Sequence, residues 1–290
     1  MTGPAHPSVV APAPWKQDFK AHLEHIGGSS AEFYLATVTP EGLPKVRTCI
    51  HRGFWGKLAE NEHNKLPKNP DIYDSDCLVS TTDARMEKTY HMFATGKGKG
   101  DREQAKSGTG GGGPVEAVYW VKDTMTQWRI SGKGWVVGAD DLEGTEDAQN
   151  SGTVTVKAQV GRYMRPINDH EEKHKEWSWK RQVENQFENL SPGMRGSFKN
   201  PPPGKPLAEG TESSGEKLGQ KAGHLSEEEL ARKNFRVVII TPEVVERVDL
   251  SNPDNSKRWI YTLSKEHSTN GEQGDEGKPA QEWDVVETWP

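Results

Sequence analysis

The stretch Val79-Ser-Thr-Thr-Asp-Ala-Arg-Met-Glu-Lys-Thr-Tyr90 joins a predicted strand to a predicted helix. The apolar run at 77–79 indicates the strand. Asp83 is a residue type that favours the N-cap position, and the apolar positions after it predict a helix over 84–94. Such a junction brings free backbone N–H groups and the positive end of a helix to one place.

Hydroxyls and cations converge on this junction. Thr81 and Thr82 precede the predicted helix, and Arg85 and Lys88 lie in its first turns. Arginine and lysine give charge-assisted hydrogen bonds to phosphate, which are stronger than neutral ones. The stretch therefore predicts a phosphate site.

The composition indicates one core with long polar additions. Of 290 residues only 32% are hydrophobic, and the 30 glycines and 19 prolines gather in a few stretches. We therefore expect a single domain over 1–290, with flexible insertions at about 96–114, 200–229 and 265–281. The remaining residues are enough to bury a sizeable interior.

Charge and cysteine usage narrow the class of protein. The net charge of -6 gives no dominant basic face, which argues against a nucleic-acid-binding protein. The N-terminal residues show no basic segment followed by a long apolar run, so we expect a cytoplasmic protein without a membrane partner. Cys49 and Cys77 both lie in apolar strand patterns, which predicts buried free thiols in a reducing compartment.

Short apolar runs separated by turn signals repeat along the chain. With an amphipathic helix at 15–26, a charged helix at 170–190 and no alternation of strand and helix, they predict a mostly β protein, a closed antiparallel barrel with helical additions. A further short element is expected at 154–158. The predicted strands are 33–38, 45–54, 77–81, 115–121, 125–130, 132–137, 235–241, 244–250, 259–263 and 283–289.

Five blocks, in this order, resemble the pyridoxamine-phosphate-oxidase-like family of FMN-binding split barrels. The resemblance spans roughly 15–131 and 236–290, and it is closest to the branch known only as an FMN-binding domain. The blocks are Arg47-Thr-Cys-Ile-His-Arg52, Ser80-Thr-Thr-Asp-Ala-Arg-Met-Glu-Lys88, Thr126-Gln-Trp-Arg-Ile-Ser-Gly132, Lys257-Arg-Trp-Ile-Tyr261 and Trp283-Asp-Val-Val-Glu-Thr-Trp-Pro290.

The resemblance implies a homodimer of split antiparallel β-barrels with FMN at the subunit interface. In this family the residues that match Arg47 and Lys88 bind the FMN phosphate, and the hydroxyl that matches Thr82 borders it. The residue that matches Gln127 bonds the flavin ring. Arg258 matches an arginine that reaches the cofactor from the other chain.

Four more arginines are candidate contacts. Arg52 stands where the family's oxidases carry a lysine near the ring and the substrate. Arg85 is a further cation for the phosphate. Arg129 shares the strand of Gln127 and, two residues on, points to the same face. Arg195 lies in the region where the family places a substrate-contacting helix.

Departures from the family's pattern bear on the substrate. The oxidases place a tryptophan at the position of Val248, and substrate-binding arginine and histidine at those of Asp254 and Ser256. A carboxylate in place of a cation disfavours a phosphorylated substrate. We therefore expect an FMN-dependent oxidoreductase for an unidentified small molecule, with a non-catalytic flavin-binding or sensing module as the alternative and a true pyridoxamine 5'-phosphate oxidase as a further one. Another cofactor of related barrels, heme or a deazaflavin, stays open.

The residues assign no catalytic acid, base or metal. His170-Glu-Glu-Lys-His174 has the spacing of a zinc-protease helix, but its flanks are wholly polar and no third ligand follows. We therefore expect no metal site there.

Overall fold

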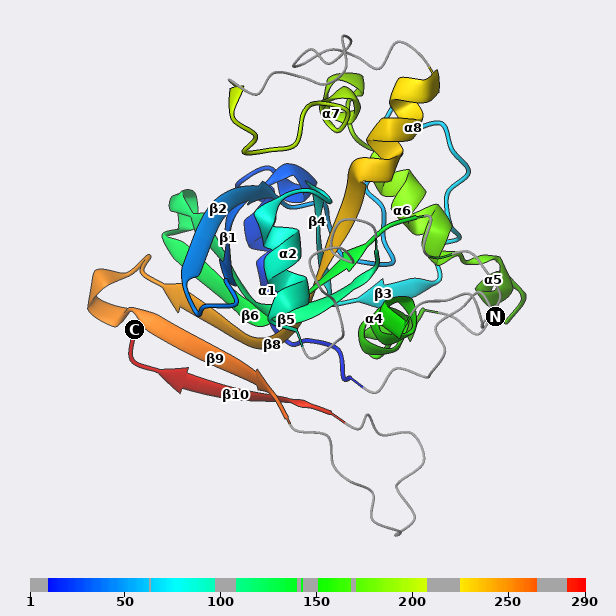
Figure 1. Cartoon of the computed structure of the whole chain (residues 1–290). Helices are drawn as coiled ribbons and strands as arrows, with labels where there is room; N and C mark the ends of the chain where they lie inside the picture. The colour runs from blue at the N-terminus through cyan, green and yellow to red at the C-terminus, as the bar shows by residue number, and fades with distance from the viewer. Residues whose placement is uncertain are drawn as a thin grey trace.

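A long antiparallel sheet that curls around an apolar interior forms the centre of the protein. The computed structural model describes residues 10–62, 64–96, 108–139, 142, 151–167, 171–207, 225–264 and 281–290. Within these residues the strand order is β10-β9-β8-β6-β5-β1-β2, β4 also pairs with β8, and β3 and β7 form a separate pair. Figure 1 shows the curled sheet, with β9 and β10 extending from it as a two-stranded wing.

The strands are β1 (Glu32–Val38), β2 (Pro44–Ile50), β3 (Tyr73–Ser75), β4 (Leu78–Asp83), β5 (Gly110–Val121), β6 (Thr126–Val137), β7 (Met164–Pro166), β8 (Phe235–Asp249), β9 (Lys257–Leu263) and β10 (Trp283–Thr288). The helices are α1 (Lys16–Glu24), α2 (Glu87–Ala94), α4 (Ser151–Gly161), α5 (Glu171–Glu176), α6 (Trp179–Glu188), α7 (Pro192–Ser197) and α8 (Leu225–Asn234). The predicted β-rich architecture with helical additions is confirmed.

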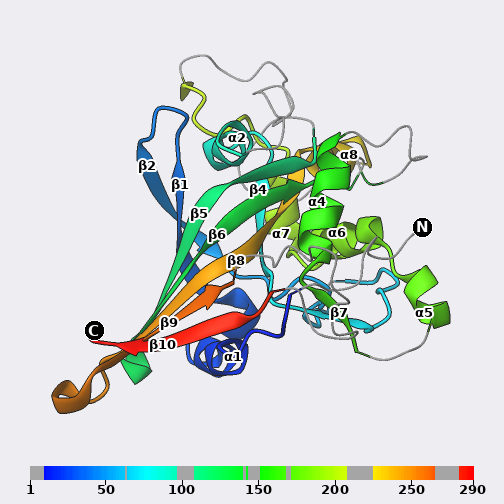
Figure 2. The same ribbon diagram turned by 90° about the horizontal axis from the view of Figure 1, so that it is seen from below.

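Two apolar clusters fill the two sides of the sheet. The first joins α1 and α2 to the barrel interior and includes Phe19, Phe33 and Trp128. The second lies under α4 and α6 and includes Trp55 and Trp177. Figure 2 shows α4, α6 and α8 gathered on one side of the sheet, with α1 beneath β9 and β10. Side chains alternate along each strand, so one sheet supplies both clusters.

Two strands, β6 and β8, are continuous where the sequence predicts a break in each. β6 runs through Gly132, and β8 runs through Pro242, because a β-bulge between the two strands absorbs the irregularity. Proline is tolerated at bulges, where no ladder hydrogen bond is required of it. A Cβ on Gly132 would lie 2.0 Å from the carbonyl oxygen of Thr241, so the close approach of the strands requires glycine here.

Three predicted boundaries are wrong. The expected insertion at 96–114 ends earlier, because Gly110 to Pro114 already belong to β5. The segment 154–158 lies inside α4. The expected helix at 170–190 is two helices, since Ser178 ends the first segment and caps α6 by accepting a hydrogen bond from the Arg181 amide.

Cys49 and Cys77 are both free and buried, as predicted. In the part of the chain that the structure describes, no helix combines the length and the apolar character needed to cross a bilayer.

Candidate functional site

Arg47 on β2 is anchored by one nitrogen and open along its other edge. Its Nη1 donates to the carbonyl oxygens of Leu35 (3.0 Å) and Lys45 (3.1 Å) and to the hydroxyl of Thr37 (2.7 Å). Within the described residues no hydrogen bond uses Nε or Nη2. Burial disfavours the charged form of Arg47 and lowers its pKa. An anion bound at the Nε–Nη2 edge would favour the charged form again. The Nε–Nη2 edge is the geometry that grips a phosphate with two parallel bonds.

Lys88, in the first turn of α2, is a buried cation. Lys88 is only 7% exposed, and its amine forms no hydrogen bond or ion pair with the described residues. Burial lowers the pKa of Lys88, and the nearby Arg47 lowers it further. Both cations also act on the Cys49 thiol, so the three side chains share one neighbourhood. An unpaired buried amine is costly unless a ligand supplies the counter-charge.

The two predicted hydroxyls point to opposite faces of β4. Thr82 is buried and shares its face with Leu78, which belongs to the same cluster as Met92 of α2. Thr81, one residue earlier, points to the other face. The hydroxyl of Thr82 makes only a 3.3 Å contact to the carbonyl oxygen of Asp83. Of the pair, Thr82 is therefore the one on the side of α2.

The structure corrects the predicted role of Asp83 and the position of Arg85. Asp83 is the last residue of β4, and α2 begins only at Glu87 after Met86, which offers no side-chain cap. Arg85 lies in the intervening turn, where its Nε and Nη2 donate to Asp83 at 2.9 and 2.6 Å. Its Nη2 also donates to the carbonyl oxygen of Phe198 at 3.1 Å. Arg85 is thus neutralised by its own neighbour rather than held one helical turn from Lys88.

Gln127, Arg129 and Arg258 lie on the outer face of the sheet. Arg129 and Arg258 both form ion pairs with Glu246, which stands opposite Arg129 on β8. Burial alone would raise the pKa of Glu246, but the hydrogen bonds from the two arginines bring it below its usual range. Gln127 is half-buried and pairs across the ladder with the exposed Trp120. The outer face therefore joins a flat aromatic to polar groups.

Arg52 contacts α7, but not through Arg195, the residue of that helix predicted to face the substrate. Arg52 reaches Met194 of α7, with 3.8 Å between Nη2 and the thioether sulfur, and burial lowers the pKa of Arg52. Its Nε is buried without a hydrogen-bond partner among the described residues. Arg195 turns away to Glu188, which also pairs with Arg232. Met194, not Arg195, is the α7 residue beside Arg52.

Sequence reasoning missed Thr37, His91 and Glu246. Thr37 and His91 give no local signal, because each is one residue of an ordinary strand or helix and they meet only when α2 packs on β1. Glu246 could have been found from strand pairing, since it falls opposite Arg129 once β6 and β8 are put in register.

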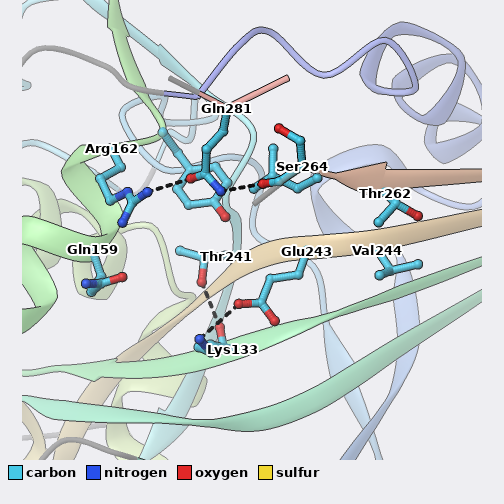
Figure 3. Close-up of a pocket in the computed structure, with 11 residues that line it drawn as sticks. Lys133, Gln159, Arg162, Thr241, Glu243, Val244, Thr262, Ser264 and Gln281 are labelled. Atoms are coloured by element: carbon cyan, nitrogen blue, oxygen red, sulfur yellow. Dashed lines mark hydrogen bonds and ion pairs between the residues drawn. The ribbon is translucent and has the colours of Figure 1, made fainter. Parts of the chain in front are cut away.

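A separate pocket of about 400 Å³ lies between α4, the middle of β8 and the C-terminal end of β9 (Figure 3). Lys133 and Glu243 form an ion pair of 3.0 Å at its edge, and Arg162 donates to Gln281 at 2.5 Å. The pocket shares no residue with the predicted cofactor contacts. Its cations have partners, so Arg47 and Lys88 form the better anion site. The lining residues are Lys133, Gln159, Arg162, Tyr163, Thr241, Glu243, Val244, Thr262, Leu263, Ser264 and Gln281.

The His-rich helix offers no visible metal centre. His170 lies outside the described residues, and the Nδ1 of His174 is bonded to the Tyr73 hydroxyl at 2.8 Å. Among the residues that the structure describes, no group of three or more potential ligands converges.

Comparisons with known proteins bear on the fold of this chain. Residues 12–138 match the family model described as pyridoxamine 5'-phosphate oxidase, FMN-binding domain. A pyridoxamine 5'-phosphate oxidase-related, FMN binding protein from Nostoc punctiforme PCC 73102 is similar over 97% of this chain and 100% of its own, with a TM-score of 0.53 and 18% identity. PhzG from Burkholderia lata 383 aligns over 97% of this chain and 98% of its own, but its TM-score of 0.39 and 11% identity are too low to establish a shared fold alone. A search of curated proteins finds no match. The family model and the Nostoc structure together confirm the split-barrel fold.

Proposed function

We propose that this protein binds FMN with its phosphate at Arg47 and Lys88, since residues 12–138 match the model of the pyridoxamine 5'-phosphate oxidase FMN-binding domain. One observation carries the proposal: a fixed guanidinium with a free edge stands beside a buried amine without a partner among the described residues. The phosphate of FMN carries about two negative charges near neutral pH, and two cations match it. Thr82, on the same side, adds a hydroxyl.

We infer that a second copy of the chain completes the site. The outer face exposes Tyr34 (53%) and Val46 (69%), which are large apolar groups for a solvent-facing sheet. Gln127 and Arg258 lie on this same face. A homodimer formed there would bury the apolar groups and bring Arg258 of one protomer toward the cofactor of the other.

The bound flavin would supply hydride or single-electron transfer, and the protein would bind and orient it. Arg52, beside Met194, is the cation proposed for the substrate side. Asp254 and Ser256 lie in an exposed turn, where a carboxylate would repel a phosphorylated substrate. The proposed activity is therefore oxidoreduction of a small molecule other than pyridoxamine 5'-phosphate.

A second candidate is a flavin-binding module without turnover. It is favoured by the ion pair between Arg195 and Glu188, which keeps this arginine from a substrate. Reduction of the bound flavin by a physiological donor, followed by reoxidation with an organic substrate, would decide for the enzyme.

The first test is a titration of the purified protein with FMN and with riboflavin, followed by flavin fluorescence. Arg47→Gln and Lys88→Met should each weaken FMN binding by about 10-fold to 100-fold, because each removes a charge-assisted hydrogen bond. Riboflavin lacks the phosphate, so its affinity should change little. Lys122→Gln, which removes an exposed lysine charge from the turn between β5 and β6, is the matched control. A protein that is purified without flavin and fails to bind added FMN would refute the proposal.

A further inference from the structure

A buried chain of hydrogen bonds leads from Arg47 into α2. Arg47 Nη1 lies 2.7 Å from the hydroxyl of Thr37, and that hydroxyl lies 2.9 Å from Nδ1 of His91. Thr37 is 1% exposed and His91 5% exposed. Three elements, β1, β2 and α2, each contribute one residue, so the chain forms only in the folded barrel.

The chemistry of the groups fixes the direction of the first hydrogen bond, and the tautomer of His91 sets the second. A guanidinium can only donate, so the Thr37 oxygen accepts from Arg47. The inference takes the hydroxyl hydrogen to be donated to the Nδ1 of His91, in the tautomer of the neutral imidazole that carries its proton on Nε2.

The surroundings of His91 favour that neutral form. Burial lowers the pKa of His91, and the positive charge of Arg47 lowers it further. Lys45 acts in the same direction, whereas Glu87 and Glu41 act against it. A lowered pKa favours the neutral imidazole over a competing cation, and the neutral ring has one nitrogen that can accept from Thr37.

We propose that His91 is a positioning residue that, through Thr37, fixes the edge of Arg47 that meets the FMN phosphate. Nη1 carries two hydrogens but has three acceptors, Thr37 and two carbonyl oxygens. When His91 accepts the hydroxyl hydrogen, the Thr37 lone pairs turn toward Arg47 Nη1, and the Nε–Nη2 edge is left for the ligand. Without that acceptor the hydroxyl can rotate, and the guanidinium loses one of its three anchors. The inference rests on the proposed function, because the phosphate is the ligand that the edge would serve.

The test compares two substitutions at one position. Asparagine places an acceptor oxygen where the imidazole has Nδ1, and leucine does not. We expect His91→Leu to raise the dissociation constant of FMN about 5-fold, the effect of one lost hydrogen bond, and His91→Asn to restore it to within about 2-fold of wild type. Riboflavin affinity should stay unchanged in both variants. The melting temperature of each variant is measured alongside.

A second pair of variants acts from the other end of the chain. Thr37→Val removes the hydroxyl at nearly constant shape, and Thr37→Ser keeps it. Thr37→Val should weaken FMN at least as much as His91→Leu, and Thr37→Ser should bind like wild type. In a double-mutant cycle, adding His91→Leu to Thr37→Val should not weaken FMN binding further, because the hydroxyl that links His91 to Arg47 is already absent. If His91→Leu does not fold, this pair still tests the Thr37 hydroxyl on which the inference depends: Thr37→Val binding FMN like wild type would overturn it.

Three results would overturn the inference. His91→Leu could bind FMN like wild type, or weaken FMN and riboflavin equally, which would make His91 an ordinary core residue that only holds α2 to β1. Full additivity of the two substitutions would show that His91 does not act through Thr37. Failure of the wild-type protein to bind FMN is a different outcome, since it removes the proposed function itself.

Discussion

His51 makes the stability of this protein dependent on pH in a way that can be calculated. The residue is 1% exposed and is enclosed by the rings of Phe19, Phe54 and Tyr119. Its Nδ1 lies 3.2 Å from the Tyr119 hydroxyl. Burial, with a smaller contribution from the charge of Arg52, lowers the pKa of His51 from 6.5 to about 3.

The sign follows from proton binding. Between pH 6.5 and pH 3 the unfolded chain protonates His51 and the folded protein does not, so acid favours unfolding. At pH 5, protonation of His51 in the unfolded chain shifts the folding equilibrium toward unfolding by a factor of roughly 30. This factor corresponds to a loss of about 2 kcal/mol in the free energy of unfolding relative to pH 7.5. This is a large part of the stability of a typical domain, about 5–15 kcal/mol.

The assay is urea unfolding at pH 7.5 and pH 5 for wild type and His51→Asn. Asparagine keeps a polar atom at the position that faces Tyr119 but does not titrate in this range. Other groups contribute equally to both proteins, so the difference in pH dependence isolates His51. Wild type should lose about 2 kcal/mol more than the variant. Equal losses would refute the reasoning; an NMR titration showing an imidazole pKa near 6.5 in the folded protein would refute it independently.

Two further predictions concern the fold. Asp76 is fully buried and accepts two hydrogen bonds from Arg165 at 2.6 and 2.8 Å. Asp76→Asn should therefore lower the free energy of unfolding by about 3–5 kcal/mol in urea titrations. A loss below about 1 kcal/mol would show that the ion pair is dispensable. Gly132→Ala should destabilise the protein by about 2 kcal/mol or more, because the new methyl would lie 2.0 Å from the Thr241 carbonyl oxygen. Gly193→Ala is the control: its methyl meets open space, so the variant should be neutral or slightly stabilised. Equal stabilities of the two variants would contradict the argument.

The strands were predictable because each half-buried strand alternates, as β1 does with Phe33 and Leu35 inward and Tyr34 outward. The continuity of β6 and β8 was not, because glycine and proline are local signals of a break. Their pairing tolerates both residues through a bulge that exists only between the two strands. Tertiary pairing here overrides local propensity.

At the site, the sequence located the cations but not their partners. Arg47 and Lys88 lie close enough that the charge of Arg47 lowers the pKa of Lys88. Arg85 looked equivalent to Lys88 in sequence, yet the carboxylate two residues earlier holds it with two hydrogen bonds. Arg129 and Arg258 lie far apart in sequence and share Glu246 through strand register alone. Whether an arginine or lysine forms an ion pair with a carboxylate therefore depends on contacts that no local sequence pattern encodes.

At the proposed phosphate site, two cations would be enough to match the charge of the ligand. The ion pair with Asp83 withdraws Arg85 from this role. What remains is Arg47 and Lys88, two charges for a group that carries about two. A ligand without that group would leave a buried amine unmatched, which is more costly than a missing contact at the surface. Selectivity for FMN over riboflavin would then come from the phosphate relieving the unmatched charge of Lys88, which riboflavin leaves as it is in the free protein.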